Sequence, residues 1–176
     1  MIKKIFLLLL LLQVLISCST KKKSDEAVKK VYPAERFGQL NRSIIDSVLQ
    51  QNGNIRIDSH KPLVIIYYPG KDKCNSSGTS TRQSTEVWYN QMEIGINKIK
   101  PSNILYVYKD STGLFQRNDG FKDWKKDPNE IIEKTFFKEH PPCSGYVLVS
   151  DTGRYISCLA EFDKKFLWQR LEQLVN

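Results

Sequence analysis

The sequence predicts an α/β fold in which helices cover both faces of a mixed central sheet. Apolar runs of strand length alternate with amphipathic helical stretches over residues 34–176, which is typical of such a layered domain. The run Leu63–Tyr68 is apolar and aromatic throughout, as expected for a strand that is buried on both faces. Two later runs flank Asp151-Thr152-Gly153, a short connection that favours an antiparallel hairpin.

The first predicted element is a helix over residues 34–52, which precedes the sheet. Its apolar residues recur at intervals of three to four and form one stripe: Phe37, Leu40, Ile44, Ile45, Val48 and Leu49. Asn52-Gly53-Asn54 ends this helix, and the alternating residues Ile55–Asp58 predict a short strand. The central strand follows and ends at Pro69-Gly70.

The middle of the chain predicts a second strand that is joined to the first by a helix. Residues 71–84 form a polar loop that contains Cys74. A helix over Thr85–Lys98 follows this loop, with Ser84 as its N-cap. The β-branched and aromatic run Asn103–Tyr108 is the next predicted strand.

The last third of the chain predicts a short helix, a hairpin and a final helix. Residues 113–127 show no regular pattern and are expected to form a loop. The short helix begins at Pro128, because proline is favoured at a first helical position. The strands Gly145–Ser150 and Arg154–Leu159 form the hairpin, which is expected to add antiparallel strands at the edge of the sheet. The last helix, Asp163–Val175, has one apolar face and begins with Asp163 as its N-cap.

Residues 1–17 have the features of a secretory signal peptide. Two lysines precede an apolar run that is too short for a comfortable transmembrane helix, which needs about 20 apolar residues. The run ends in Leu15-Ile16-Ser17-Cys18, which resembles the lipobox of bacterial lipoproteins at all four positions. The resemblance implies that residues 1–17 are removed and that Cys18 becomes the lipidated N-terminus, with palmitate-type chains that hold it on a membrane. The alternatives are an ordinary cleaved signal and a single anchor helix.

Residues 18–33 are polar and charged, and they are expected to form a flexible tether between Cys18 and a domain over residues 34–176. The chain has a net charge of +8, but residues 1–30 hold seven lysines against two acidic residues, which leaves only +3 for the remainder. This distribution argues against nucleic-acid binding. Ser19 follows the lipidated cysteine, and in enteric bacteria a residue other than Asp there favours the outer membrane. The predicted location is therefore the cell envelope, on the outer membrane facing the periplasm.

From Lys61 to the C-terminus, the order of elements resembles the thioredoxin fold. The resemblance rests on the strand PLVIIYY with its cysteine-bearing loop and helix, and on the hairpin SGYVLVSDTGRYI with its amphipathic helix. This layout is similar to that of membrane-anchored thioredoxin-like proteins and peroxiredoxins. It implies that Cys74 corresponds to the nucleophilic thiol of the family's Cys-x-x-Cys motif, with Ser77 in place of the resolving cysteine. It also implies that the loop with Cys143 faces the loop with Cys74, so Cys143 is the predicted resolving partner.

Two further features depart from the pattern of that family. Residues 75–81 are poor helix formers, so the helix is expected to begin later than Cys74. The thiol would then lose the helix N-terminus that lowers a cysteine pKa. Pro142 lies near the position of the family's cis-proline, although the spacing back from Gly153 points closer to Ser144.

The cysteines allow several roles. An exported compartment permits disulfides, and Cys74 with Cys143 forms either a redox couple or a static bond that stabilises the domain by about 2–4 kcal/mol. Cys158 lies inside a strand pattern and is predicted to be a small buried hydrophobe. With His140 these thiols offer metal ligands, but structural zinc sites usually have two close pairs and this sequence has one, so no metal site is predicted. The sequence has no recognisable phosphate loop, catalytic triad or cofactor motif.

Two functional hypotheses follow from these patterns. In the first, an exported, membrane-anchored lipoprotein exchanges thiols and disulfides with a substrate through Cys74, with Cys143 as the second thiol. In the second, a non-catalytic lipoprotein uses the same scaffold to bind a protein partner or to assemble, and its cysteines are structural. The position of Cys74 after the central strand favours the first hypothesis, and the missing Cys-x-x-Cys motif favours the second.

Overall fold

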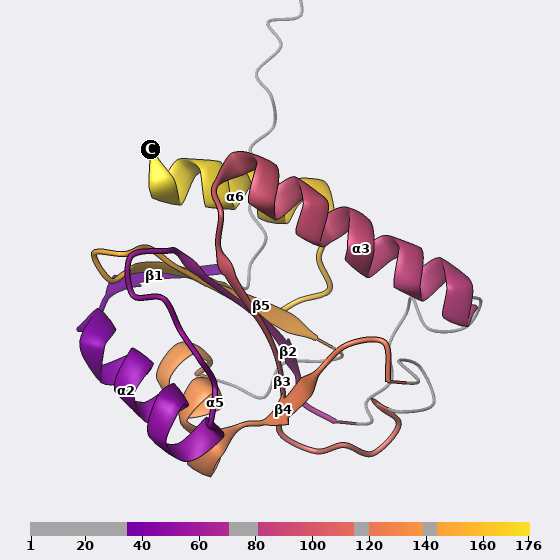
Figure 1. Cartoon of the computed structure of the whole chain (residues 1–176), viewed down its shortest axis with the longest axis horizontal. Coiled ribbons are helices and arrows are strands. Elements are labelled where there is room, and N and C mark those ends of the chain that lie inside the picture. Colours follow the sequence, from indigo (N-terminus) through magenta and orange to yellow (C-terminus); the bar gives the residue numbers. More distant parts are fainter. Residues whose placement is uncertain (1–34, 71–80, 115–119, 139–143) are drawn as a thin grey trace, which may run out of the picture. The chain divides into compact units, whose positions relative to one another are not determined.

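Among the residues described by the computed structural model, which are 35–70, 81–114, 120–138 and 144–176, six strands form one mixed sheet (Figure 1). In chain order the strands are β1 (Glu35–Gln39), β2 (Leu63–Tyr68), β3 (Asn103–Tyr108), β4 (Trp124–Lys126), β5 (Gly145–Val149) and β6 (Arg154–Cys158). Their order across the sheet is β1-β6-β5-β2-β3-β4. β2, β3 and β4 are parallel, whereas β5 is antiparallel to β2 and β6, and β1 is antiparallel to β6.

Helices cover both faces of this sheet. They are α2 (Arg42–Gly53), α3 (Arg82–Ile99), the 3₁₀ helix η1 (Pro128–Glu130), α5 (Ile131–Phe136) and α6 (Lys164–Val175). Figure 1 shows α3 and α6 on one face, and α2 and α5 on the other. The side chains of β2 alternate between the two apolar cores: Val64 and Ile66 pack toward α3 and α6, and Leu63 and Ile65 toward α2 and α5.

The order and direction of the central strands define the fold. β2, α3 and β3 form a parallel β-α-β unit, and β5, β6 and α6 form an antiparallel hairpin with a following helix. These two units join through β2 and β5, which gives the central order β3-β2-β5-β6. This is the arrangement of the thioredoxin fold, so the predicted fold class is confirmed.

Several predicted elements agree with the structure. All six residues of β2 are buried, as a strand covered on both faces requires. β3 has the predicted bounds, and the predicted hairpin strands become β5 and β6. The Asp163 carboxylate accepts a hydrogen bond from the backbone N–H of Lys165 at 2.9 Å, which confirms Asp163 as the N-cap of α6.

The predicted N-terminal helix is wrong in its first part. Residues 35–39 form β1, and the helix begins at Arg42 with Asn41 as its N-cap. Phe37, which was expected on the apolar stripe, is 59% exposed. Gly38 lies under the ring of Tyr155, where an added Cβ would come within 2.5 Å of the ring. Residues 35–39 therefore pair with β6 as a strand, although the apolar residues of this segment have the spacing of a helix. Phe37, which would lie on the apolar face of that helix, is not part of the core.

The predicted strand over residues 55–58 does not form, because this segment pairs with no strand. The side chain of Asn103 holds it instead: the backbone N–H of Asp58 donates to Asn103 Oδ1 at 2.9 Å, and Asn103 Nδ2 donates to the Asp58 carbonyl at 2.8 Å. The predicted loop over residues 113–127, in turn, contains β4. Three residues are too few to show a strand pattern in the sequence.

Two other expectations need correction. α3 begins at Arg82 rather than at Thr85, with Thr81 as its N-cap instead of Ser84. The hairpin does not lie at the edge of the sheet: β5 lies between β2 and β6, and β1 covers the outer side of β6. β1 and β4 are the outer strands.

β1 is fixed to α6 as well as to β6. The guanidinium of Arg170 makes two hydrogen bonds of 2.7 Å with the carboxylate of Glu35, and the side chain of Glu35 is only 7% exposed. On the other face, Arg36 donates to the carbonyl of Phe136 at 3.1 Å. A two-pronged arginine–carboxylate contact of this kind is among the stronger ion pairs.

In the described part of the chain, no helix combines the length and apolar character needed to cross a bilayer.

Candidate functional site

The predicted nucleophile Cys74, its predicted partner Cys143 and the predicted lipidation residue Cys18 all lie outside the described residues. The strands next to the first two are described. β2 and β5 are hydrogen-bonded neighbours, and Tyr67 lies opposite Gly145. Because these strands are antiparallel, the end of β2 that leads to Cys74 and the start of β5 that follows Cys143 lie side by side at one end of the sheet.

The backbone at this end of β2 and β5 is closely packed. A Cβ at Gly145 would lie 2.6 Å from the carbonyl oxygen of Cys158 and 3.3 Å from the ring of Phe137, so no larger residue fits there. Gly70, which follows β2, has a φ of 142°, a conformation that favours glycine. Glycines thus allow the chain to leave β2 and to enter β5 at this end of the sheet.

The helix after the Cys74 loop begins with a capping box. The backbone N–H of Ser84 donates to Thr81 Oγ1 at 3.1 Å, and the backbone N–H of Thr81 donates to Ser84 Oγ at 2.9 Å. The prediction that this helix begins later than Cys74 is confirmed, since α3 begins at Arg82. The first turn of α3 therefore has its own hydrogen-bond acceptors from residues 81 and 84.

A buried acid and a buried phenol lie on the α2 side of β2. Asp127 is 2% exposed, and its carboxylate accepts hydrogen bonds of 3.0 Å from the backbone N–H groups of Ile132 and Glu133. Burial raises the pKa of Asp127, although these two hydrogen bonds oppose the rise. Burial and the nearby charge of Asp127 raise the pKa of Tyr67, whose hydroxyl has no hydrogen bond of good geometry within the described ranges.

Cys158 is the one cysteine in the described part of the chain, and it is free and fully buried. Burial raises the pKa of its thiol, which keeps it protonated at neutral pH. Its Sγ lies 3.9 Å from the carbonyl oxygen of Ala160. The prediction that Cys158 is a packing residue is confirmed. Its burial and raised pKa make it a poor nucleophile.

Aromatic side chains gather between α3 and the outer part of the sheet. The ring centroids of Tyr106 and Trp124 are 5.2 Å apart, and Tyr89 lies 5.3 Å from Tyr106 and 5.9 Å from Phe121. Tyr68 contacts Trp124 edge-on at 6.3 Å. These contacts pack the aromatic rings against one another and against the sheet. Described residues offer no hydrogen-bond partner to the buried Nε1 of Trp124.

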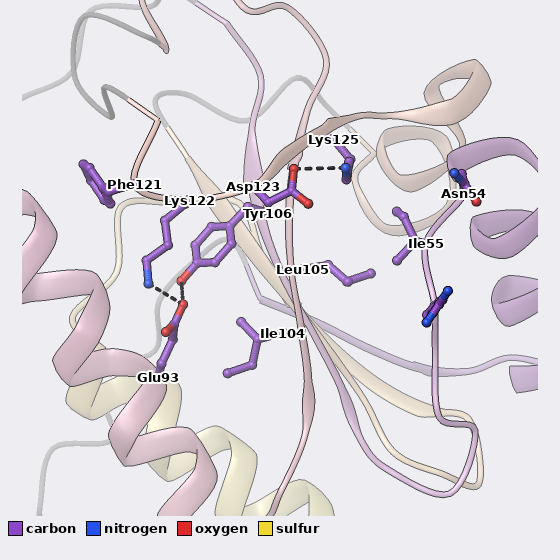
Figure 2. Close-up of a pocket in the computed structure, with 11 residues that line it drawn as sticks. Asn54, Ile55, Glu93, Ile104, Leu105, Tyr106, Phe121, Lys122, Asp123 and Lys125 are labelled. Carbon is purple, nitrogen blue, oxygen red and sulfur yellow. Dashed lines mark hydrogen bonds and ion pairs between the residues drawn. The ribbon is translucent and has the colours of Figure 1, made fainter.

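Glu93, Tyr106 and Lys122 form a polar group at the border of this aromatic cluster (Figure 2). Glu93 Oε1 accepts hydrogen bonds of 2.6 Å from the Tyr106 hydroxyl and from Lys122 Nζ. Lys122 Nζ also donates to Asn90 Oδ1 at 3.1 Å, and it lies 5.6 Å from the centre of the Tyr106 ring. Burial, followed by the contact with Glu93, raises the pKa of Tyr106. This group joins α3 to the segment before β4.

Next to this group is a groove of about 480 Å³ (Figure 2). It lies along β3, and its lining includes residues of α3, of the segment after α2 and of the segment that leads into β4: Asn54, Ile55, Arg56, Glu93, Ile104, Leu105, Tyr106, Phe121, Lys122, Asp123 and Lys125. This volume lies within the range of ligand pockets, and the lining combines apolar side chains with a similar number of polar and charged ones. The sequence does not reveal this groove, because its residues come from four separate segments without a shared motif.

The described residues contain no group of three or more potential metal ligands. Of the residues considered as metal ligands in the sequence, Cys74, His140 and Cys143 lie outside the described ranges. His60, the one histidine in the described ranges, is exposed.

Replacing Glu93 with leucine is expected to lower the free energy of unfolding by about 1–2 kcal/mol, because Lys122 and Tyr106 lose their shared acceptor. The Lys122 side chain is only 10% exposed, so water does not fully replace the carboxylate. Urea unfolding measures the change. Asp123→Asn is the matched control, since Asp123 is 80% exposed and its ion pair with Lys125 is expected to contribute about 0–1 kcal/mol. Equal effects of the two substitutions would contradict this role of Glu93.

Comparison with known proteins gives the following similarities. No family model matches the sequence, and no curated protein matches it. The structure is similar to a secreted disulfide oxidoreductase of Mycobacterium tuberculosis that is homologous to E. coli DsbE, with a TM-score of 0.39 and 12% identity over 65% of this chain and 83% of that chain. M. tuberculosis DsbF is similar with a TM-score of 0.39 and 13% identity, over 74% of this chain and 85% of that chain. At such scores, the assignment of the fold rests on the strand order and helix placement described above.

Proposed function

We propose that this chain is an exported lipoprotein whose thioredoxin-like domain carries out thiol–disulfide exchange through Cys74 and Cys143. The observation that carries the proposal is the pairing of β2 with β5, in which Tyr67 lies opposite Gly145. This pairing brings the end of β2, which precedes the Cys74 segment, next to the start of β5, which follows the Cys143 segment. The buried, protonated Cys158 is excluded from the exchange by its burial and raised pKa.

The proposed reaction has two steps. The thiolate of Cys74 attacks a substrate disulfide, which forms a mixed disulfide and releases one substrate thiolate. The thiolate of Cys143 then attacks the Cys74 sulfur, which closes a Cys74–Cys143 disulfide and releases the second substrate thiolate. The substrate gains two electrons, and the protein loses them. A dithiol reductant in the same compartment returns the pair to its reduced form.

The proposed location follows from the N-terminal residues. The lipobox-like sequence that ends in Cys18 supports removal of residues 1–17 and anchoring through acyl chains on that cysteine. The tether over residues 18–33 then separates the domain from the bilayer. The proposed setting is the cell envelope, on the outer membrane facing the periplasm, where disulfides persist.

The first experiment uses the reduced full chain in detergent, with insulin as the disulfide substrate. Cys74→Ser is expected to abolish insulin reduction, because no other thiol replaces the nucleophile. Cys143→Ser is expected to stop turnover and to accumulate a mixed disulfide between Cys74 and insulin, which mass spectrometry detects. Cys158→Ala, a buried position outside the reaction, is the control and retains activity. Unchanged insulin reduction in Cys74→Ser would refute the proposal.

The second candidate is a non-catalytic binding or assembly module with a structural Cys74–Cys143 bond. The capping box of α3 favours it, since this helix begins at Arg82 and its first turn is capped by its own side chains. Alkylation and peptide mapping separate the two candidates. A disulfide that dithiothreitol opens in the folded protein supports exchange chemistry. A disulfide that resists dithiothreitol until urea unfolds the domain supports the structural role.

A further inference from the structure

The outer edge of β3 is only partly covered by β4. β4 pairs with Tyr106–Tyr108 and leaves the first half of β3, Asn103–Leu105, without a partner on that side among the described residues. The backbone N–H of Asn103 donates to the Pro62 carbonyl at 2.8 Å, and that of Lys109 donates to Tyr68 at 2.9 Å, so the odd-numbered residues of β3 face β2. Because successive residues alternate, the N–H and C=O of Ile104 face away from β2.

The groove described above straddles this free edge (Figure 2). Ile55 and Leu105 belong to the core on the α2 face, whereas Ile104 and Tyr106 belong to the core on the α3 face. The two walls therefore stand on opposite faces of the sheet, with the edge of β3 between them. Such a space suits an added strand, whose side chains alternate toward the two walls while its backbone meets the edge.

The charges of the groove are not balanced. Lys122 is paired with Glu93 at 2.6 Å, and Lys125 is paired with Asp123 at 3.0 Å. Arg56 is exposed, and no carboxylate in the described part of the chain pairs with it. The hydrogen bonds between Asn103 and Asp58 fix the segment that carries this guanidinium beside β3. Within the described ranges, the groove thus presents a guanidinium that pairs with no carboxylate, next to a stretch of β3 that pairs with no strand on its outer side.

We propose that this groove binds an extended segment of a partner polypeptide, which adds to the edge of β3 at Ile104 and places a carboxylate against Arg56. The unpaired stretch of three residues gives a contact of about 10 Å at a rise of about 3.3 Å per residue, so the bound segment is short. The charge of Arg56 selects acidic segments over basic ones. This site is separate from the proposed cysteine chemistry and does not depend on it.

A fluorescein-labelled peptide, Thr-Val-Glu-Val-Thr, tests the proposal against the full chain in detergent. Fluorescence anisotropy is expected to show binding, and NMR hydrogen exchange is expected to show slower exchange of the Ile104 amide. Arg56→Glu is expected to weaken binding by about ten-fold or more. Lys165→Glu, an equal change of charge at an exposed position of α6, is the matched control and leaves binding unchanged. Replacing the central glutamate of the peptide with lysine is expected to weaken binding to the unsubstituted protein.

Three results would overturn this proposal. The first is the absence of peptide binding at about 1 mM, a weak affinity that even a short segment should reach. The second is equal binding to the unsubstituted chain and Arg56→Glu. The third is a concentration-dependent dimer that Arg56→Glu dissolves, which would assign the groove to a second copy of the chain. Retained peptide binding in Cys74→Ser would separate this site from the proposed exchange reaction.

Discussion

Arg42→Ala is expected to lower the free energy of unfolding by about 3–5 kcal/mol, because it leaves a buried carboxylate without its counter-ion. Arg42 and Asp46 are 6% and 3% exposed, and Arg42 Nε donates to Asp46 Oδ1 at 2.7 Å. The same guanidinium donates to the carbonyls of Ser150 at 3.0 Å and Lys61 at 3.1 Å. One side chain thus joins α2 to the end of β5 and to the segment before β2.

Urea unfolding of the full chain measures this effect, and two variants define its cause. Lys61→Ala removes one member of an exposed ion pair, with 47% and 43% of the two side chains accessible, and is expected to cost about 0–1 kcal/mol. Arg42→Met combined with Asp46→Leu removes both buried charges and is expected to be less destabilising than Arg42→Ala alone. A double variant that is less stable than Arg42→Ala would show that the charge on Asp46 is not the cause.

Gly95→Leu is expected to cost about 3 kcal/mol, although leucine is intrinsically a better helix former than glycine. A Cβ at Gly95 would overlap the indole of Trp168, so α3 and α6 approach each other through this glycine. The indole is also held in place, since Trp168 Nε1 donates to the carbonyl of Met92 at 3.1 Å. A larger side chain must therefore push the two helices apart or displace the ring.

The control for this substitution is Lys98→Leu on the same helix, where the side chain is exposed and the expected change is within about 0.5 kcal/mol. Trp168→Ala makes room at the contact, so Gly95→Leu should cost less in that background than in the unsubstituted protein. Additive losses in the double variant would show that the two residues do not meet as described.

The central part of the fold was predictable from sequence because burial on both faces leaves a strong local signal. In β2 all six residues are buried, and an uninterrupted apolar run is the direct result. The start of the domain gave a misleading signal. Phe37 continues the spacing of the following helix, but it occurs where the backbone pairs with β6, more than a hundred residues away. A pairing over that distance leaves no local pattern.

The polar groups of the described region were not predictable for a similar reason. Glu93, Tyr106 and Lys122 belong to a helix, a strand and an irregular segment, and only the folded chain brings them within 2.6 Å contacts. The groove beside them lies where β4 is too short to cover the first half of β3. A strand of three residues leaves no recognisable pattern in the sequence. The assignment of Cys74 and Cys143 to a reaction stays a prediction, since both residues lie outside the described ranges.

The pairing of β1 with β6 has a consequence for how the chain reaches its folded state. Of the strands in the described ranges, β1 is synthesised first and β6 last, yet they are neighbours in the sheet. The sheet cannot close until residue 158 has emerged, and contacts over so long a loop form slowly. Among these strands, β1 is therefore the one that waits longest for its partner.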